Sequence, residues 1–202
     1  MYYIVGLGNP GAEYEKTRHN VGFMAVEYLC EQESLLDFSV DALLEVRRTE
    51  GKVLGQTVQC ILPTTFMNHS GVAVKRVVPE EAVNKLIVVH DEVDLPLGQV
   101  RFSFNRGAGG HNGVESIISH LGRKDFVRVR MGIAPINEET GQAVRPTGDR
   151  LANFVLRKFG PEELDKVAQA IKEVKHLLEV MIERGLEVAM NEGNQSGFNK
   201  VG

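Results

Sequence analysis

One histidine near the N-terminus stands where a general base could work. Residues 2–7 are mostly apolar and β-favouring and predict a strand, and Pro10 with the glycines around it predicts a turn. His19 follows, directly before the apolar-rich segment 21–30, which predicts a helix. The partial positive charge of a helix N-terminus disfavours imidazolium, so we expect a neutral His19 that accepts a proton near neutral pH. The alternative is that His19 is only a cap or a surface residue.

Other polar side chains also come just after predicted strands. They are Asn9, Asp91, Asn112 and the loop of Phe66, Met67 and Asn68. Asp91 follows the apolar run 86–89 after one intervening histidine, and Asn112 follows a glycine-rich stretch. Because ligands bind outside the carboxyl ends of strands in α/β sheets, we expect these segments to converge on one active site. Taken singly, Asp91 could be a turn residue and Asn112 a helix cap.

This set of side chains favours hydrolysis by water. A carboxylate such as Asp91 can fix the tautomer of a histidine and stabilise the imidazolium that forms when the histidine activates water. Asparagine amides can donate to a developing oxyanion without adding charge. The sequence offers no obvious serine or cysteine nucleophile and no cluster typical of a metal site, so we expect neither metal nor cofactor. An ester is therefore a more credible substrate than an unactivated amide.

The elements that must position these residues alternate between strands and helices, which predicts an α/β fold. We expect a single-domain sandwich, with a twisted mixed β-sheet flanked by helices on both faces, over residues 1–190 and a flexible tail over 191–202. The predicted strands are 2–7, 37–46, 53–62, 86–89, 100–104, 126–133 and, as a short last one, 153–156. The predicted helices are 21–30, 72–78, 114–121 and a long one that starts at Gly160 and ends near Gly185, and residues 135–150 are expected to form a mobile loop.

Composition limits the function classes. The chain has 202 residues and 43% hydrophobic content, enough for one core, and no apolar run long enough for a membrane span. It lacks a secretory signal pattern, and Cys30 and Cys60 are expected to be free core thiols. The net charge is -4, yet residues 101–130 hold six basic and two acidic side chains. This uneven distribution is typical either of a weak grip on a phosphate backbone or of a solvated face.

A dinucleotide-binding module is one alternative. Residues 6–11 match the pattern G-x-G-x-x-G after a strand. In a dinucleotide fold the helix opens inside that motif, whereas Pro10 removes a donor here and the helix is predicted to start only near His19. We therefore expect no bound nucleotide at these glycines.

Several separate motifs occur in order along the chain: 4–11 (IVGLGNPG), Tyr14, 17–20 (TRHN), 63–68 (PTTFMN), 90–96 (HDEVDLP) and 109–113 (GGHNG). Through these motifs the chain resembles bacterial peptidyl-tRNA hydrolases along nearly its whole length. The resemblance implies a cytoplasmic, cofactor-free monomer that cleaves the ester between a peptide and the 3′ ribose of tRNA, bound through its CCA end and acceptor stem. No membrane contact and no obligate protein partner are implied.

The resemblance also implies roles for individual residues. His19 would be the general base, Asp91 its partner, and Asn9 would help to distinguish blocked from free aminoacyl groups. Asn68 and Asn112 would bind the peptide, the terminal ribose and water, and Tyr14, Phe66 and Met67 would shape the pocket.

The residues expected to bind tRNA differ from the family pattern at one position. Many members carry a lysine near the position of Ser103 that clamps the tRNA 5′-phosphate together with an arginine matching Arg130. Arg101 or Arg106 would stand in for that lysine here. A further alternative is a non-catalytic RNA-binding homologue, like the plant relatives that serve in intron splicing. The presence of His19 and Asp91 favours the enzyme.

Overall fold

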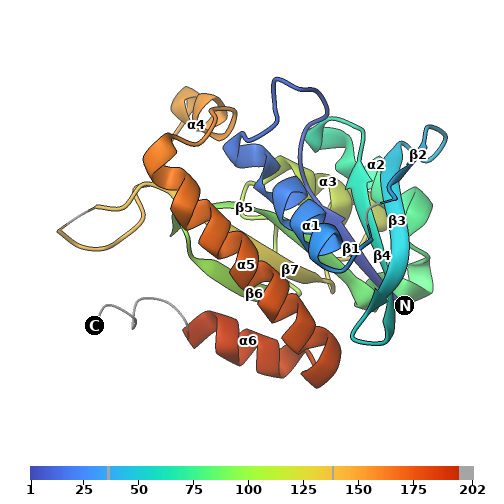
Figure 1. Cartoon of the computed structure of the whole chain (residues 1–202). Coiled ribbons are helices and arrows are strands. Elements are labelled where there is room, and N and C mark those ends of the chain that lie inside the picture. The colour runs from blue at the N-terminus through green and yellow to red at the C-terminus, as the bar shows by residue number, and fades with distance from the viewer. Residues whose placement is uncertain (36, 138, 196–202) are drawn as a thin grey trace.

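The chain forms one mixed seven-stranded sheet between two layers of helices (Figure 1). The computed structural model describes residues 1–35, 37–137 and 139–195. The order across the sheet is β2-β3-β4-β1-β5-β7-β6, in which β4, β1, β5 and β7 are parallel neighbours and β2, β3 and β6 are antiparallel to theirs. The strands are β1 (Tyr2–Gly6), β2 (Ser39–Asp41), β3 (Val46–Val53), β4 (Gln56–Pro63), β5 (Leu86–Pro96), β6 (Val100–Phe104) and β7 (Val127–Ala134). The predicted fold class is confirmed.

Helices cover each face of the sheet over a separate apolar core (Figure 1). One face packs against α1 (Val21–Gln32), α5 (Pro161–Arg184) and α6 (Leu186–Gln195), and the other against α2 (Ser70–Val77) and α3 (Asn112–Leu121). The remaining helices are η1 (Arg18–Asn20), η2 (Met67–His69), η3 (Glu80–Lys85) and α4 (Asp149–Val155). Because side chains alternate along a strand, Ile4 and Ile87 enter the first core, whereas Val5 and Val88 enter the second.

Glycines allow the start of α1 to pack closely against the carboxyl ends of β1 and β5. A Cβ on Gly22 would lie 2.3 Å from the Val89 carbonyl oxygen, and one on Gly6 would lie 2.6 Å from the Gly22 oxygen. A Cβ on Gly8 would lie 2.7 Å from the ring of Phe23. These glycines permit close packing of the helix on the sheet, and α1 begins well after Gly11. The helix therefore does not open inside the glycine motif, as a dinucleotide fold requires.

The predicted hairpin was misplaced. Residues 47–51 were expected to separate two strands because they are polar, but they lie inside β3, which pairs with β4 on one side and β2 on the other. The tight turn lies at Leu54 and Gly55, whose φ angles of 48° and 78° suit a two-residue hairpin loop. A strand near the edge of a sheet tolerates polar residues on its exposed face, which explains the error.

Two elements near the site also differ from the prediction. β5 continues to Pro96, so Asp91 lies within the strand and pairs with Met131 of β7, not in a loop after the strand. Residues 153–155 of the short strand expected at 153–156 instead belong to the helix α4. Because α4 begins at Asp149, the last two residues of the loop predicted at 135–150 are helical.

The C-terminal boundary is also different. The tail was expected to start at residue 191, but residues 191–195 complete α6. The Gly193 carbonyl accepts from Arg101 of β6 at 2.7 Å, and Asn194 Oδ1 accepts from the Phe102 amide at 3.2 Å. The rest of the predicted tail, 196–202, lies outside the described residues.

Two further observations concern the whole fold. Both cysteines are buried and free. Among the described residues, no helix has the length and apolar content needed to cross a membrane.

Candidate active site

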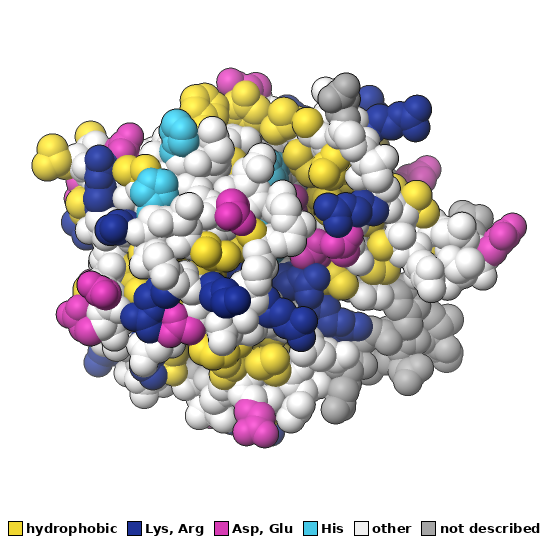
Figure 2. Space-filling view, turned by 180° about the vertical axis from the view of Figure 1, so that it is seen from behind, with side chains coloured by type: hydrophobic (Ala, Val, Ile, Leu, Met, Phe, Trp, Pro, Cys, Tyr) yellow, Lys and Arg dark blue, Asp and Glu magenta, His cyan; other side chains and the backbone are white. Residues whose placement is uncertain are grey.

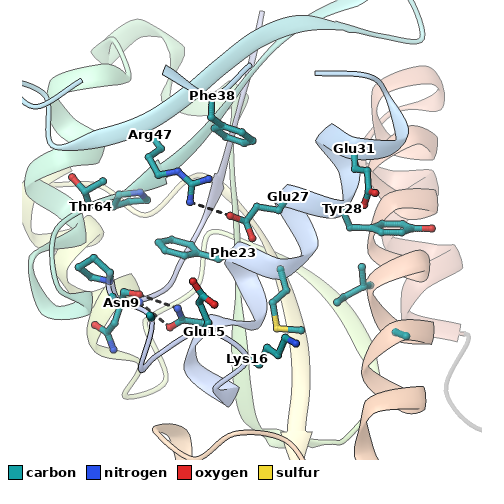
Figure 3. A pocket seen from close by; sticks show the side chains of 18 of the residues that line it. Asn9, Glu15, Lys16, Phe23, Glu27, Tyr28, Glu31, Phe38, Arg47 and Thr64 are labelled. Atoms are coloured by element: carbon teal, nitrogen blue, oxygen red, sulfur yellow. Dashed lines mark hydrogen bonds and ion pairs between the residues drawn. The ribbon is translucent and has the colours of Figure 1, made fainter. Parts of the chain in front are cut away.

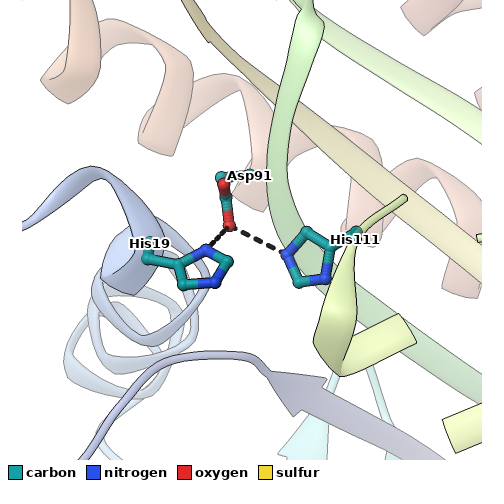
Figure 4. Close-up of side chains that lie close together, drawn as sticks. All are labelled: His19, Asp91 and His111. Carbon is teal, nitrogen blue, oxygen red and sulfur yellow. Dashed lines mark hydrogen bonds and ion pairs between the residues drawn. The ribbon is translucent and has the colours of Figure 1, made fainter. Parts of the chain in front are cut away.

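Three side chains from distant parts of the sequence meet at one oxygen atom (Figure 4). His19 Nδ1 lies 2.8 Å from Asp91 Oδ1, and His111 Nε2 lies 2.9 Å from the same oxygen. Asp91 is 2% exposed and His19 is 8% exposed. The two N···O distances are those of charge-assisted hydrogen bonds, although the spacing of the three groups could also hold a metal ion. We describe the group as a hydrogen-bonded triad, and the expectation of a metal-free site stays a prediction.

The hydrogen bonds fix the proton positions on both histidines. His111 Nδ1 accepts from the backbone N–H groups of Gly113 and Val114, at 3.1 and 3.2 Å, and so caps α3. Its proton must therefore be on Nε2, which donates to Asp91. His19 donates from Nδ1 to the same carboxylate, which leaves His19 Nε2 as an unprotonated acceptor turned away from Asp91 (Figure 4). That nitrogen is the atom able to take a proton from water.

Asp91 sets the charge balance of the site. Burial alone would lower the pKa of His19, but the charge of Asp91 and its hydrogen bond outweigh burial and raise that pKa above its ordinary value of 6.5. Burial alone would raise the pKa of Asp91, but the two histidines outweigh it and hold that pKa well below its usual range. The expectation that the α1 N-terminus keeps His19 neutral was therefore wrong in direction, because the adjacent carboxylate has the larger effect.

A third histidine, His90, packs against the triad. His90 Nδ1 donates to the Asp91 carbonyl at 2.7 Å, and its ring packs edge-on against His111 with centroids 4.7 Å apart. Burial, and then the neighbouring His111, lowers the pKa of His90 well below its ordinary value, so this ring stays neutral. A neutral His90 adds packing to the site without competing for the charge of Asp91.

The two neighbours of His19 in sequence anchor it on opposite sides. The Arg18 guanidinium donates to both carboxylate oxygens of Glu163 at 2.7 Å and to the Lys158 carbonyl at 2.9 Å, and it lies 4.5 Å from the centroid of Phe154. These contacts attach the turn of η1 to the region where α4 meets α5. Asn20 Oδ1 accepts from the Asn9 amide N–H at 2.9 Å, and Asn20 Nδ2 donates to the Asn9 carbonyl at 2.9 Å. The backbone of His19 is thus fixed on both sides, which leaves its side chain little freedom to move.

Two hollows adjoin this site. A cavity of about 210 Å³ is lined by His19, Asp91, Asn112, the glycines before α3, and residues of α4 with Arg145 from the loop before it. A larger cleft of about 940 Å³ lies between α1, the β3–β4 hairpin and α5, where Arg47 and Glu27 form an ion pair at 3.1 Å (Figure 3). Asn9 lines the larger cleft (Figure 3), whereas His19 and Asp91 line the smaller cavity.

The loop that carries Phe66, Met67 and Asn68 meets the site through Asn9. Asn9 Oδ1 accepts from the Met67 amide N–H at 2.8 Å. The Met67 sulfur also lies 2.5 Å from where a Cβ on Gly113 would be, so only glycine leaves room for it beside His111. Phe66 is exposed and its ring meets that of Tyr14 edge-on, with centroids 6.3 Å apart. Asn68 and Asn112 are both exposed, and Asn112 lines the smaller cavity.

An arginine cluster, Arg101, Arg106, Arg128 and Arg130, lies on β6, β7 and the connection that leads to α3. Arg101 pairs with Arg130 across the two strands, and Ser103 pairs with Arg128. Their side chains lie on the α2–α3 face of the sheet, the face on which Figure 2 shows lysine and arginine side chains gathered. Arg130 binds Glu92 at 2.8 Å, and Arg101 reaches Gly193. Arg106 is exposed.

Arg128 is the unusual member of this cluster. It is 3% exposed, and it donates from Nη1 to the Gly107 carbonyl at 2.6 Å. Its Nε and Nη2 atoms, like the Ser103 hydroxyl, have no hydrogen-bond partner among the described residues. Burial, and then the charge of Arg130, lowers the pKa of Arg128 below its ordinary value. Buried donors without acceptors are costly, and those of Arg128 lie below the surface of this face.

Comparison with known proteins agrees with this geometry. A family model described as peptidyl-tRNA hydrolase matches residues 3–201. The chain is 40% identical to the peptidyl-tRNA hydrolase of Thermodesulfovibrio yellowstonii, over 96% of this chain and 100% of the relative. It is 39% identical to the peptidyl-tRNA hydrolase of Aquifex aeolicus, over 95% of both chains. The chain belongs to the peptidyl-tRNA hydrolase family.

The fold agrees as well. A crystal structure of peptidyl-tRNA hydrolase from Acinetobacter baumannii superimposes with a TM-score of 0.83 at 31% identity, covering 96% of this chain and 95% of that one. The resemblance stated from the sequence motifs is thus confirmed for family and fold.

Within this peptidyl-tRNA hydrolase fold, the structure brings most of the predicted site residues together and adds others. His19 and Asp91 bond directly, and Asn9 bonds to Met67. The arginines form a separate group on the α2–α3 face. His111 was not predicted as a site residue, although it stands directly before a helix, where a cap is expected, and Arg128 and Arg145 were also not predicted. Arg145 lies in a loop, where no periodicity in the sequence predicts the direction of a side chain.

Replacing His111 is expected to change the pH dependence of this hydrolase. His111→Asn keeps a side chain that can cap α3 but is too short to reach Asp91 as well, so Asp91 becomes a stronger acceptor for His19. We expect kcat to fall roughly tenfold, as for the loss of one hydrogen bond to a charged group, and the acid limb of the pH–rate profile to move to higher pH. Steady-state kinetics across pH measures both effects. His111→Ala should add a loss of about 1 kcal/mol of stability from the missing cap, and an unchanged profile in both variants would remove His111 from the mechanism.

Proposed function

We propose that His19 and Asp91 activate a water molecule that hydrolyses the ester between a peptide and the 3′ end of tRNA. The observation that supports this most is the bond from His19 Nδ1 to Asp91, which leaves Nε2 as the base. As the water oxygen attacks the ester carbonyl, Nε2 takes its proton, and the buried carboxylate stabilises the imidazolium. The imidazolium then returns the proton to the departing 3′ oxygen of the ribose.

The asparagines supply donors without charge. Because Asn9 Oδ1 is occupied by the Met67 amide, the NH₂ end of Asn9 is the part left for substrate. We assign it to the peptide carbonyl nearest the ester, where it would favour N-blocked over free aminoacyl groups. Asn68 and Asn112, both exposed, would bind the peptide and the terminal ribose. Uncharged donors of this kind can also stabilise the oxyanion that forms during attack.

The apolar side chains beside Asn9 suit the peptide. The edge-on rings of Tyr14 and Phe66, above the buried side chain of Met67, offer a surface that contacts varied side chains without selecting one. Phe66 is 56% exposed, so it has area left to cover a substrate. We therefore place the peptide on this side and the RNA on the α2–α3 face.

The arginine cluster would hold the acceptor stem. Arg106 is exposed and Arg130 is half-buried, so both can contact phosphate, whereas Arg128 is buried and adds only its positive charge below them. No lysine stands at position 103, so the positive charge comes from the neighbouring strand, where Arg128 pairs with Ser103. Binding of this kind is electrostatic and requires no contact with the bases. The protein would act as a cytoplasmic monomer on the CCA end and acceptor stem.

The affinity for tRNA should therefore depend steeply on salt. We expect the logarithm of the association constant to fall linearly with the logarithm of salt concentration, and Arg106→Gln and Arg130→Gln each to reduce the slope by about one. Fluorescence anisotropy with labelled tRNA at several salt concentrations measures this. Lys52→Gln is the matched control, because exposed Lys52 lies on β3, on the other side of the sheet from β6. Equal slopes in all four proteins would mean that the cluster does not hold phosphate.

The proposed activity is tested by release of amino acid from tRNA. The wild-type protein should release N-acetyl-aminoacyl groups rapidly and free aminoacyl groups slowly. Asn9→Asp is expected to weaken this preference, because a carboxylate cannot donate to the peptide carbonyl. Binding of tRNA without any release of the blocked group would instead indicate a non-catalytic RNA-binding homologue.

A further inference from the structure

The cavity lined by His19 and Asp91 also has an arginine, Arg145, in its wall. Among the described residues that line it, Arg145 is the single arginine or lysine. It comes from the loop before α4, not from the arginine cluster on β6 and β7. This loop is held in shape by a hydrogen bond from the Val144 amide to the Pro135 carbonyl at 2.8 Å and by a bridge between Ile136 and Ala143.

Arg145 forms an exposed ion pair with Asp94 that another anion can replace. Its Nη1 atom lies 2.8 and 2.9 Å from the two carboxylate oxygens of Asp94. The two side chains are 41% and 46% exposed, and an ion pair this exposed contributes little to stability. The Nη2 atom lies 3.6 Å from where a Cβ on Gly110 would be, and a Cβ on Gly109 would have nothing within 4 Å. The guanidinium therefore lies beside an open glycine turn at the cavity mouth.

The size of the cavity limits how much substrate it holds. At about 210 Å³ it is smaller than the roughly 300–1,000 Å³ of ordinary ligand sites, so it takes only the end of a tRNA. The ester lies on the 3′ ribose of the last nucleotide, and the next groups along the RNA are phosphodiesters. These must leave the cavity across its rim, where Arg145 lies. A guanidinium is the side chain best shaped to bind phosphate through two hydrogen bonds.

We propose that Arg145 binds a phosphodiester group of the 3′-terminal nucleotides of the substrate and releases Asp94 when it does so. The proposal rests on the proposed function, and it assigns to Arg145 a phosphate contact close to the scissile ester, distinct from the arginine cluster. Asp94 then acts as a competitor, because its carboxylate occupies the guanidinium in the free protein. Removing Arg145 weakens binding, whereas removing the charge of Asp94 strengthens it.

Binding of short ligands tests the proposal without relying on activity. Isothermal titration with the trinucleotide CpCpA should show about tenfold weaker binding for Arg145→Gln and tighter binding for Asp94→Asn than for the wild type. Adenosine, which has no phosphate, should bind the wild type and both variants alike. Arg150→Gln is the matched control, because Arg150 is an exposed arginine of the neighbouring α4.

The outcomes separate the two proposals. Equal loss of CpCpA and adenosine binding in Arg145→Gln would mean that the variant merely disturbs the loop, and unchanged CpCpA binding would remove the phosphate contact. Either result overturns the inference. Failure of the wild type to cleave N-acetyl-aminoacyl-tRNA would instead overturn the proposed function, whatever CpCpA binding shows.

Discussion

His19→Ala is expected to lower kcat for N-acetyl-aminoacyl-tRNA by roughly 10²–10⁴, the usual contribution of a positioned general base. The variant loses the imidazole that we propose takes a proton from water beside Asp91. KM should change little, because the phosphate contacts lie on other elements. Single-turnover rates with saturating enzyme measure the chemical step directly.

The folding of the His19→Ala variant is expected to survive. His19 lies in η1, outside the sheet, and its neighbours Arg18 and Asn20 keep their own hydrogen bonds to Glu163 and Asn9. The matched control is His176→Ala, which removes an exposed histidine of α5 that pairs with Glu192. A His19→Ala rate within a few-fold of that control would exclude His19 as the base.

Asp91→Asn should give the second largest loss. Both His19 and His111 donate to the same atom, Oδ1, so an asparagine can keep its oxygen there and preserve both hydrogen bonds. The substitution then removes the negative charge without changing the tautomer of His19. Loss of that charge destabilises the imidazolium, and we expect kcat to fall roughly 10²- to 10³-fold, less than where the tautomer is also lost.

The pH profile of Asp91→Asn has a defined sign. Asp91 raises the pKa of His19, whereas burial lowers it. Without the carboxylate only the effect of burial remains, so the acid limb of the profile should move to lower pH. Asp165→Asn, an exposed carboxylate at the start of α5, is the control. A shift to higher pH would mean that the titrating group is not His19.

The sequence alone predicted that His19 and Asp91 lie together, because each residue could be assigned to the end of a strand or the start of a helix. His19 precedes an apolar-rich helix, and Asp91 lies two residues after a continuous apolar run. Parallel topology then brings such positions to one edge of the sheet. The same argument places Asn9 and Met67, which bond to each other.

Contacts that depend on which of two neighbouring residues takes a position could not be predicted. Asn112 was expected as a possible cap of α3, since asparagine is a favoured cap. The structure shows that His111 caps the helix instead, and this orientation directs its Nε2 to Asp91. Arg145 reaches the cavity only through the path of its loop, and no periodicity encodes that path. The β3–β4 turn was misplaced because a polar strand near the sheet edge resembles a loop in composition.

The most direct test of the central claim is to compare the pH dependence of kcat/KM with the titration of the His19 ring followed by NMR. Because kcat/KM reports the pKa of the free enzyme, the rate should fall on the acid side with the midpoint at which His19 titrates. We predict that both midpoints coincide above 6.5. A rate that stays constant while His19 becomes protonated would contradict the account.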